Sequence, residues 1–189
     1  MRKILLFAIV FLLFTACSGK ASSQSFVDIR AAYLVSDVTL SADIIADYGD
    51  RCYEYGVSYS GDGKSGEVTV LSPEEICGIS ARIDENRKVS LKCDDAVIDT
   101  GVLYGTGITP VEALPLIVNA IREGYVSSVY TENLDGVDYI TVEIDETPAG
   151  ESEKIIYTLW FAAEDDSLHK AEISADGFVS VSALFKEVQ

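Results

Sequence analysis

The side chains with which this chain could do chemistry are one histidine, four cysteines and 31 acidic residues. His169 stands alone at the start of a strand-like run, a setting that favours a structural or surface role. The acidic pairs Asp94-Asp95 and Asp165-Asp166 fall in expected turns, where Asp is favoured for backbone reasons. The sequence has no G-x-S-x-G elbow, no phosphate-binding loop and no D-x-D-x-D-G calcium loop. These patterns predict no catalytic site, no metal site and no cofactor.

The N-terminus indicates export. Arg2 and Lys3 precede eleven uninterrupted apolar residues, 4–14, and then a small-residue site, as in a secretory signal peptide. Eleven helical residues reach only about 16 Å, half of a ~30 Å hydrocarbon core, so this segment is too short to span a bilayer. The run Phe14-Thr15-Ala16-Cys17 resembles a bacterial lipobox, except that Leu is usual in place of Phe14. We therefore expect cleavage before Cys17 and attachment of diacylglycerol to its thiol. The alternative is an ordinary secreted protein that is cut nearby.

The net charge limits the partners. It is −17 for the full sequence and becomes −19 when the leader is removed with Arg2 and Lys3. A surface this acidic repels phosphate backbones and anionic head groups, so neither nucleic acid nor electrostatic docking to a membrane is expected. The membrane would be held through acyl chains on Cys17, each buried CH₂ contributing about 0.8 kcal/mol. The expected location is extracytoplasmic, on the outer face of the cell membrane.

Three cysteines remain besides Cys17. Cys52, Cys77 and Cys93 have no C-x-x-C spacing and no histidine cluster beside them, so a zinc or redox site has little support. An odd number in an oxidising compartment leaves two arrangements open: one disulfide with a free thiol, or three buried thiols. We favour buried thiols.

The chain divides into three parts. Residues 1–16 are the expected signal peptide, and residues 17–25 are the lipidated cysteine with a small, polar segment that predicts a flexible tether. Residues 26–189 are expected to form a single domain, since no internal repeat or second domain is visible. A weaker helical pattern starts this domain between Phe26 and Leu34.

Alternating apolar and polar residues predict strands across most of that domain. The clearest alternation covers 38–44, 53–59, 140–144 and 179–185. The joints are short, and Asp135-Gly136 and Asp176-Gly177 are strong hairpin signals. Connections of this length cannot hold parallel crossovers, so the sheet is expected to be a largely antiparallel meander.

Two helices interrupt the strands. Ser72-Pro73-Glu74-Glu75 predicts a single turn, and Thr109-Pro110 opens the main helix, which Gly124 ends. Pro115 removes one hydrogen bond of that helix and is expected to kink it. The apolar face of the main helix is expected to contain Val111, Leu114, Ile117 and Ile121.

The predicted fold class is α+β: a strongly curved antiparallel sheet, a half-barrel, of about nine to eleven strands with two or three helices on its concave side. A plain β-sandwich with one helix is the alternative. The strand around Trp160 is apolar on both faces, so other parts of the protein must cover each of the two faces. Either the interior is a packed core, or the concave side holds an apolar cavity. The cavity would be walled by the helix face named above, by Tyr53, Tyr55, Val57 and Tyr59, and by Trp160.

Several segments together resemble the LolA-like superfamily of small lipoproteins. They are Ala42-Asp43-Ile44 with Asp47-Tyr48-Gly49-Asp50, Val70 to Ile79, Pro110 to Gly124, Leu159-Trp160-Phe161, Lys170 to Ile173 and Asp176-Gly177. Within that superfamily the chain is most similar to lipoproteins related to the spore-germination protein GerS. The resemblance implies a half-closed antiparallel barrel around helices, with an apolar hollow for a lipid or a partner. The superfamily's soluble carrier has no anchor, so Cys17 is a departure that disfavours free shuttling.

The expected function is therefore non-enzymatic: a lipid-anchored extracytoplasmic protein that binds an acyl chain or other apolar ligand, or a protein partner. Two alternatives stay open, a carboxylate-based hydrolase and a purely structural or scaffolding lipoprotein. A pair of carboxyl groups that faces a pocket with a raised pKa would favour the hydrolase.

Overall fold

One antiparallel sheet of eleven strands dominates the computed structural model, which describes residues 18–86, 88–93, 96–102, 109–150 and 152–188. Its strands are β1 (Val38–Asp47), β2 (Cys52–Gly61), β3 (Gly66–Ser72), β4 (Ser80–Ile83), β5 (Lys88–Cys93), β6 (Ala96–Val102), β7 (Tyr125–Leu134), β8 (Val137–Asp145), β9 (Ile155–Ala162), β10 (Leu168–Ala175) and β11 (Phe178–Val188). The helices are α2 (Ser18–Val35), the single-turn 3₁₀ helix η2 (Glu74–Ile76) and α3 (Pro110–Glu123). The predicted α+β class is confirmed.

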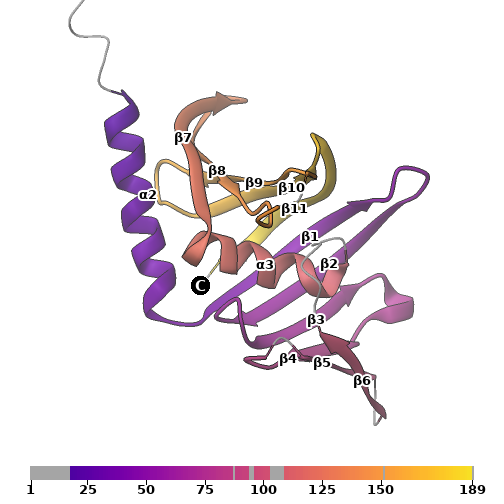
Figure 1. The fold of residues 1–189 in the computed structure, drawn as a ribbon. Helices are drawn as coiled ribbons and strands as arrows, with labels where there is room; N and C mark the ends of the chain where they lie inside the picture. Colours follow the sequence, from indigo (N-terminus) through magenta and orange to yellow (C-terminus); the bar gives the residue numbers. More distant parts are fainter. Residues whose placement is uncertain (1–17, 87, 94–95, 103–108, 151, 189) are drawn as a thin grey trace, which may run out of the picture.

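The strand order is β6-β5-β4-β3-β2-β1-β11-β10-β9-β8-β7, so the sheet consists of two meanders. β1 to β6 form the first meander, β7 to β11 form the second, and the segment that contains α3 connects them. The pairing of β1 with β11 joins the two halves in the middle of the sheet, for example at Ile44 and Ala183. The sheet does not close, because β6 and β7 remain its edges. Its curvature encloses α3, and α2 lies along one side (Figure 1).

The two Asp-Gly turns are confirmed. Leu134 pairs with Val137, which leaves a two-residue loop with φ values of 52° at Asp135 and 87° at Gly136. The loop of Asp176 and Gly177 has φ values of 47° and 82°. Positive φ at both positions is the geometry of the hairpin turn whose twist matches the flanking strands. Asp tolerates this region, and Gly enters it without strain.

α3 has the expected residues at both ends, although the Thr109 side chain caps no backbone amide of the helix. Thr109 precedes the helix, and its Oγ1 donates a hydrogen bond to Glu112 Oε2 at 2.6 Å. Gly124 ends the helix, its amide donating to the carbonyl of Ala120. The helix continues through Pro115.

α2 differs from expectation at its start. The helix begins at Ser18, so residues 18–25, which were expected to be a flexible tether, are helical. Phe26, Ile29 and Tyr33, spaced for one helix face, are buried at 3, 3 and 7% exposure. This face packs on β7, β8 and α3, and the packing supports a helix that weak local propensity alone does not predict. Neither helix of the described residues combines the length and the hydrophobicity of a membrane span.

Two arginines tie α2 and α3 to each other. Arg30 of α2 donates from Nε to the carbonyl of Ile121 at 2.6 Å and from Nη2 to that of Gly124 at 2.9 Å. Arg122 of α3 donates from Nη2 to the carbonyl of Ser36, just past the end of α2. Each arginine therefore satisfies carbonyl groups that the other helix leaves unpaired at its C-terminus.

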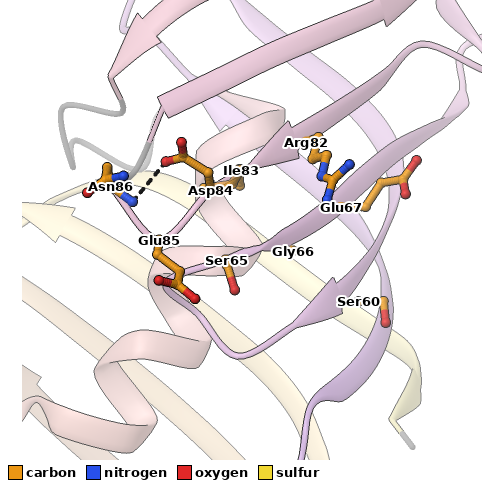
Figure 2. Close-up of a pocket in the computed structure, with 9 residues that line it drawn as sticks. All are labelled: Ser60, Ser65, Gly66, Glu67, Arg82, Ile83, Asp84, Glu85 and Asn86. Atoms are coloured by element: carbon orange, nitrogen blue, oxygen red, sulfur yellow. Dashed lines mark hydrogen bonds between the residues drawn. The ribbon is translucent and has the colours of Figure 1, made fainter.

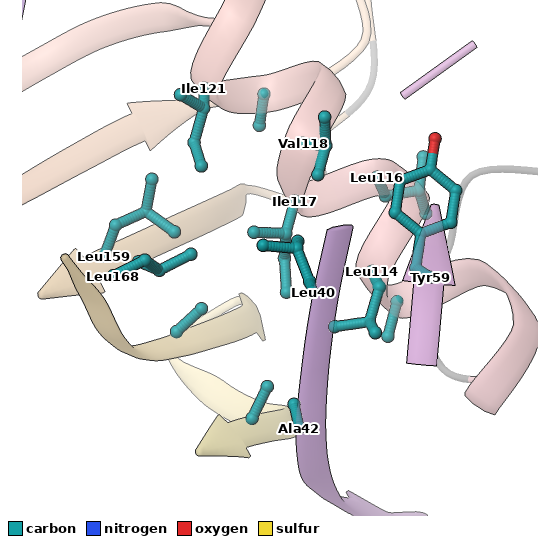
Figure 3. Close-up of a cluster of buried hydrophobic side chains, with 14 of the residues drawn as sticks. Leu40, Ala42, Tyr59, Leu114, Leu116, Ile117, Val118, Ile121, Leu159 and Leu168 are labelled. Carbon is teal, nitrogen blue, oxygen red and sulfur yellow. The ribbon is translucent and has the colours of Figure 1, made fainter. Parts of the chain in front are cut away.

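The core fills the concave side of the sheet. Inward side chains of the strands and the inner faces of both helices belong to one continuous cluster. Figure 3 shows Leu114 and Ile117 of α3 directed toward Leu40 of β1, with Leu159 and Leu168 of the second meander nearby. α3 thus joins the two halves of the sheet.

Candidate functional site

Five of the nine residues expected to wall a cavity come together on the concave side. Val57 and Tyr59 of β2 and Leu114, Ile117 and Ile121 of α3 are all at 0 or 1% exposure in the same cluster. Their side chains contact one another and the sheet in a packed interior. In this conformation these five side chains form part of the packed core, and the described residues leave no cavity between them.

The hydroxyl group of the buried Tyr59 is hydrogen-bonded to the backbone. Its hydroxyl accepts a hydrogen bond from the Gly63 amide at 2.7 Å and donates one to the Ser65 carbonyl at 2.9 Å. These bonds hold the loop between β2 and β3 against the end of α3, where Lys64 Nζ lies 2.6 Å from Glu123 Oε1. Burial raises the pKa of Tyr59 to about 12, against the lowering effect of the bond from Gly63.

The other two tyrosines lie at the open end of the concave side. Tyr53 is 40% exposed, and Tyr55 is half-buried and packs on the core. Their rings are stacked at 6.3 Å, and Tyr48 of the β1–β2 turn meets Tyr53 edge-on at 5.8 Å. We call these three residues the tyrosine cluster. It is an aromatic surface that continues from the core to solvent.

The tyrosine cluster lies beside the first turn of α3. Burial raises the pKa of Tyr48, and the neighbouring phenols Tyr55 and Tyr53 and the carboxylate of Glu112 raise it further. Glu112 itself is 8% exposed and is the second residue after Pro110 in the helix. We call the tyrosine cluster and the neighbouring first turn of α3 together the mouth.

The structure does not bring Trp160 together with the other residues of the expected wall. Its indole Nε1 donates to Glu132 Oε1 at 2.6 Å, and Lys170 Nζ lies 4.8 Å from the ring centre. Thr141 Oγ1 donates to the same carboxylate oxygen at 2.7 Å. These partners occupy the outer face of the sheet, whereas Tyr157, Leu159 and Phe161 face the core. The side chain of Val111 and all of Cys17 lie outside the described residues.

Three hollows are lined mainly by side chains that point away from the core. One of about 660 Å³ lies at the β4–β5 turn, where Arg82, Glu67 and Asp84 surround it (Figure 2). A second, of about 470 Å³, crosses β1, β2 and β11 next to Ile45 and Leu184. The third lies across β7 to β10 near Lys154. None of the three is lined by a described residue of α3.

Three carboxyl groups that lie in turns have lowered pKa values. Hydrogen bonds from Ser65 and Lys64 lower the pKa of Asp62 although burial opposes them. The hydroxyl and amide of Thr147 lower the pKa of Asp145, and those of Ser167 lower that of Asp165. These three carboxylates stabilise turns.

The cysteines and the histidine lie at the surface. Cys52, Cys77 and Cys93 are free and exposed, so the expectation of buried thiols is wrong. They stand at strand ends or beside η2, where the core does not reach. Among the described residues, no three His, Cys, Asp or Glu side chains gather as a metal site would require. His169 is exposed and its ring contacts Tyr139 at 5.3 Å.

Comparisons with known proteins find distant structural neighbours. No family model and no curated protein matches the chain. Among solved structures it is similar to a LolA superfamily protein from Nitrosomonas europaea, with 10% identity, a TM-score of 0.44 and coverage of 92% of this chain and 94% of that one. Lipoprotein LppX from Mycobacterium tuberculosis shows 14% identity, a TM-score of 0.46 and coverage of 88% and 92%. LprF from Mycobacterium bovis shows 13% identity, a TM-score of 0.46 and coverage of 89% of this chain and 93% of that one. Similarity this distant carries no argument about function, and the fold class rests on the strand order above.

Sequence reasoning missed two features of the site. Tyr48 lies beyond the end of β1, outside the alternating pattern, so only its nearness in sequence to Tyr53 could have indicated the contact. Arg30 lies within the helical pattern expected between Phe26 and Leu34, but its partners are two carbonyl groups at the C-terminal end of α3, more than 90 residues away. No local signal reveals such a partner.

Proposed function

We propose that this chain is a lipid-anchored extracytoplasmic protein, held on the outer face of the cell membrane through Cys17, that binds an apolar ligand without catalysing a reaction. In this proposal it is a lipoprotein of the LolA-like, GerS-related kind that its sequence resembles. The observation that carries the ligand proposal is the tyrosine cluster. Tyr53 and Tyr48 keep 40 and 45% of their surface in water although their rings are continuous with the core.

The mouth offers an apolar chain a way inward. Aromatic rings that are half in water suit the first contact with an acyl chain, because each ring presents a large apolar surface. The space behind them is occupied by Leu114, Ile117 and Ile121, which are completely buried. A long chain therefore binds only if α3 moves away from β1, β2 and β3. Burying about ten methylenes would contribute roughly 8 kcal/mol before association costs, which limits the affinity to micromolar.

The test is fatty-acid binding by protein in which Cys17 is replaced by Ser. Native mass spectrometry should detect a bound apolar species, and a fluorescent fatty acid should be displaced by unlabelled fatty acid. Tyr53→Ala should weaken binding about fivefold or more, because it removes an aromatic contact at the mouth. The matched control is Tyr130→Ala, whose ring is 39% exposed on the outer face of β7. Equal affinities for the two variants would refute the mouth as the entry, and no uptake would refute the ligand.

A protein partner is the second candidate. The complete burial of the α3 face favours it, because a partner's side chain can rest on the tyrosine cluster without any movement of α3. In that case Tyr53→Ala would abolish partner capture while fatty acids fail to bind to the unaltered protein. Exposed tyrosines are enriched at such contacts.

A further inference from the structure

We infer that α2 lies along the surface of the bilayer, so that the domain docks on the membrane through an exposed apolar stripe of this helix. The stripe consists of Val27, Ala31, Leu34 and Val35. The inference rests on the anchor at Cys17 that the proposed function includes, and it adds a second membrane contact to that anchor.

α2 is apolar on two faces. Phe26, Ile29 and Tyr33 face the core, while Val27, Leu34 and Val35 are 58, 56 and 83% exposed. Val27, Ala31 and Leu34 follow one another at the i, i+4 and i+7 positions that line one side of a helix. Apolar residues that line the outer side of a helix form an exposed patch, and such a patch is typical of a contact with a membrane or another protein. Figure 1 shows α2 at the side of the molecule, with the sheet and α3 all on its other side.

The position of the anchor selects the membrane as the occupant. α2 begins at Ser18, which follows Cys17 in the sequence, so the expected acylation site is next to the first residue of the helix. At 1.5 Å per residue, Val27 lies about 14 Å and Leu34 about 24 Å along the helix from its first residue, Ser18. An upright helix would lift Leu34 well clear of the bilayer, whereas a helix that lies flat brings the whole stripe into the head-group region. Because the anchor would hold α2 at the bilayer, the effective concentration of the bilayer around the helix would be high. Docking on the bilayer is therefore favoured over binding to a separate protein.

The charge of α2 fits this surface. The chain has 31 acidic residues in 189, but the eighteen residues of α2 contain one, Asp28, together with Lys20 and Arg30. Asp28 lies beside the stripe, where it accepts a hydrogen bond from Gln24 at 3.3 Å. The general acidity that repels anionic head groups is thus absent along this helix.

An exposed tyrosine, Tyr125, lies at the junction of α3 and β7, close to α2. It follows Gly124, whose carbonyl binds Arg30, and it is 75% exposed at the start of β7, which packs on α2. A tyrosine beside an apolar helix face is typical of the membrane interface, where the ring is buried and the hydroxyl stays in water.

The test places tryptophans on and off the stripe of the lipidated protein. Val27→Trp and Leu34→Trp report on α2, and Leu71→Trp and Phe178→Trp are matched controls at 50 and 49% exposure on the sheet. The unaltered protein, whose only tryptophan is the 9% exposed Trp160, gives the baseline. Each protein is reconstituted into vesicles of phosphatidylglycerol and phosphatidylcholine with brominated acyl chains. The stripe positions should be quenched at least about threefold more than the controls, because an interfacial helix places its apolar face among the acyl chains.

Three results would overturn the inference. Quenching by aqueous iodide in place of bromine means that the stripe faces water. Protection from both quenchers means that a second copy or another protein covers it. Failure of the unaltered protein to float with vesicles, with no acyl group on its N-terminal peptide, refutes the anchor itself. Protein that floats but keeps an iodide-accessible Trp at position 34 refutes only the docking of α2.

Discussion

Replacing Tyr59 by Phe separates the structural task of this residue from any task in binding. The substitution keeps the buried ring and removes the hydroxyl that joins the Gly63 amide to the Ser65 carbonyl. Each bond is worth about 0.5–1.5 kcal/mol net, and both backbone groups lose a partner. Tyr59→Phe should therefore lower the free energy of unfolding by about 1–3 kcal/mol at neutral pH.

The stability difference between the wild type and Tyr59→Phe should decrease as the pH rises above 10. Folding raises the pKa of Tyr59 from 10.0 to about 12, so the folded state favours the protonated phenol. The contribution is complete below pH 10 and disappears as the pH rises from 10 to about 12. One pKa unit corresponds to about 1.4 kcal/mol, so a shift of two units removes about 3 kcal/mol once the pH has passed about 12. The two proteins should thus differ in stability at neutral pH and converge near pH 12.

Denaturant unfolding followed by far-UV circular dichroism measures this difference across the pH range. Tyr33, whose pKa burial also raises, titrates in both proteins, so its contribution cancels in the comparison. Tyr125→Phe is the control, because that ring is 75% exposed and should change nothing. Parallel stability curves for wild type and Tyr59→Phe, or an unchanged midpoint at neutral pH, would refute the reasoning.

Three further substitutions test the anchor, a turn and the contact between the helices. Cys17→Ala should yield a soluble protein or an uncleaved precursor, which fractionation and fatty-acid labelling detect; a mature N-terminus beyond Cys17 would contradict the anchor. Gly177→Val should lower the free energy of unfolding by more than about 1 kcal/mol. Backbone strain alone would cause this loss, since no atom lies within 4 Å of the added Cβ. In denaturant unfolding, Gly177→Asn should keep a midpoint near that of the wild type, because Asn tolerates positive φ. Arg30→Ala should cost about 1–3 kcal/mol and speed hydrogen exchange in α2, because it leaves the carbonyls of Ile121 and Gly124 unpaired; unchanged exchange would contradict that contact.

Local signals account for the parts of the fold that the sequence predicts. Asp176-Gly177 forms its turn because both residues tolerate positive φ, whatever surrounds them. α3 has its expected bounds because Thr109, Pro110 and Gly124 set the chemistry of its ends. The start of α2 could not be predicted in this way, since its first turns are rich in Ser and its docking depends on distant strands.

The candidate site shows where the same reasoning stops. Period-two alternation separates the two faces of a strand but does not say which face of a doubly apolar strand is inside. Trp160 lies outside because Glu132, from another strand, accepts its indole N–H. Alternation likewise places Tyr53 on the same face as Tyr59, although only Tyr59 lies far enough along β2 to be covered.

The pairing of β1 with β11 also sets the order in which the sheet can form. The first meander comes early in the chain, but β1 has no second neighbour until β11 is available. During that interval the long edge of β1 is exposed, and such an edge is a template for aggregation. Contacts between residues such as Ile44 and Ala183 are among the most distant in sequence, so closing the sheet requires a slow, late loop closure. A chaperone that shields β1 until β11 pairs with it would protect the molecule at the stage when aggregation is most favoured.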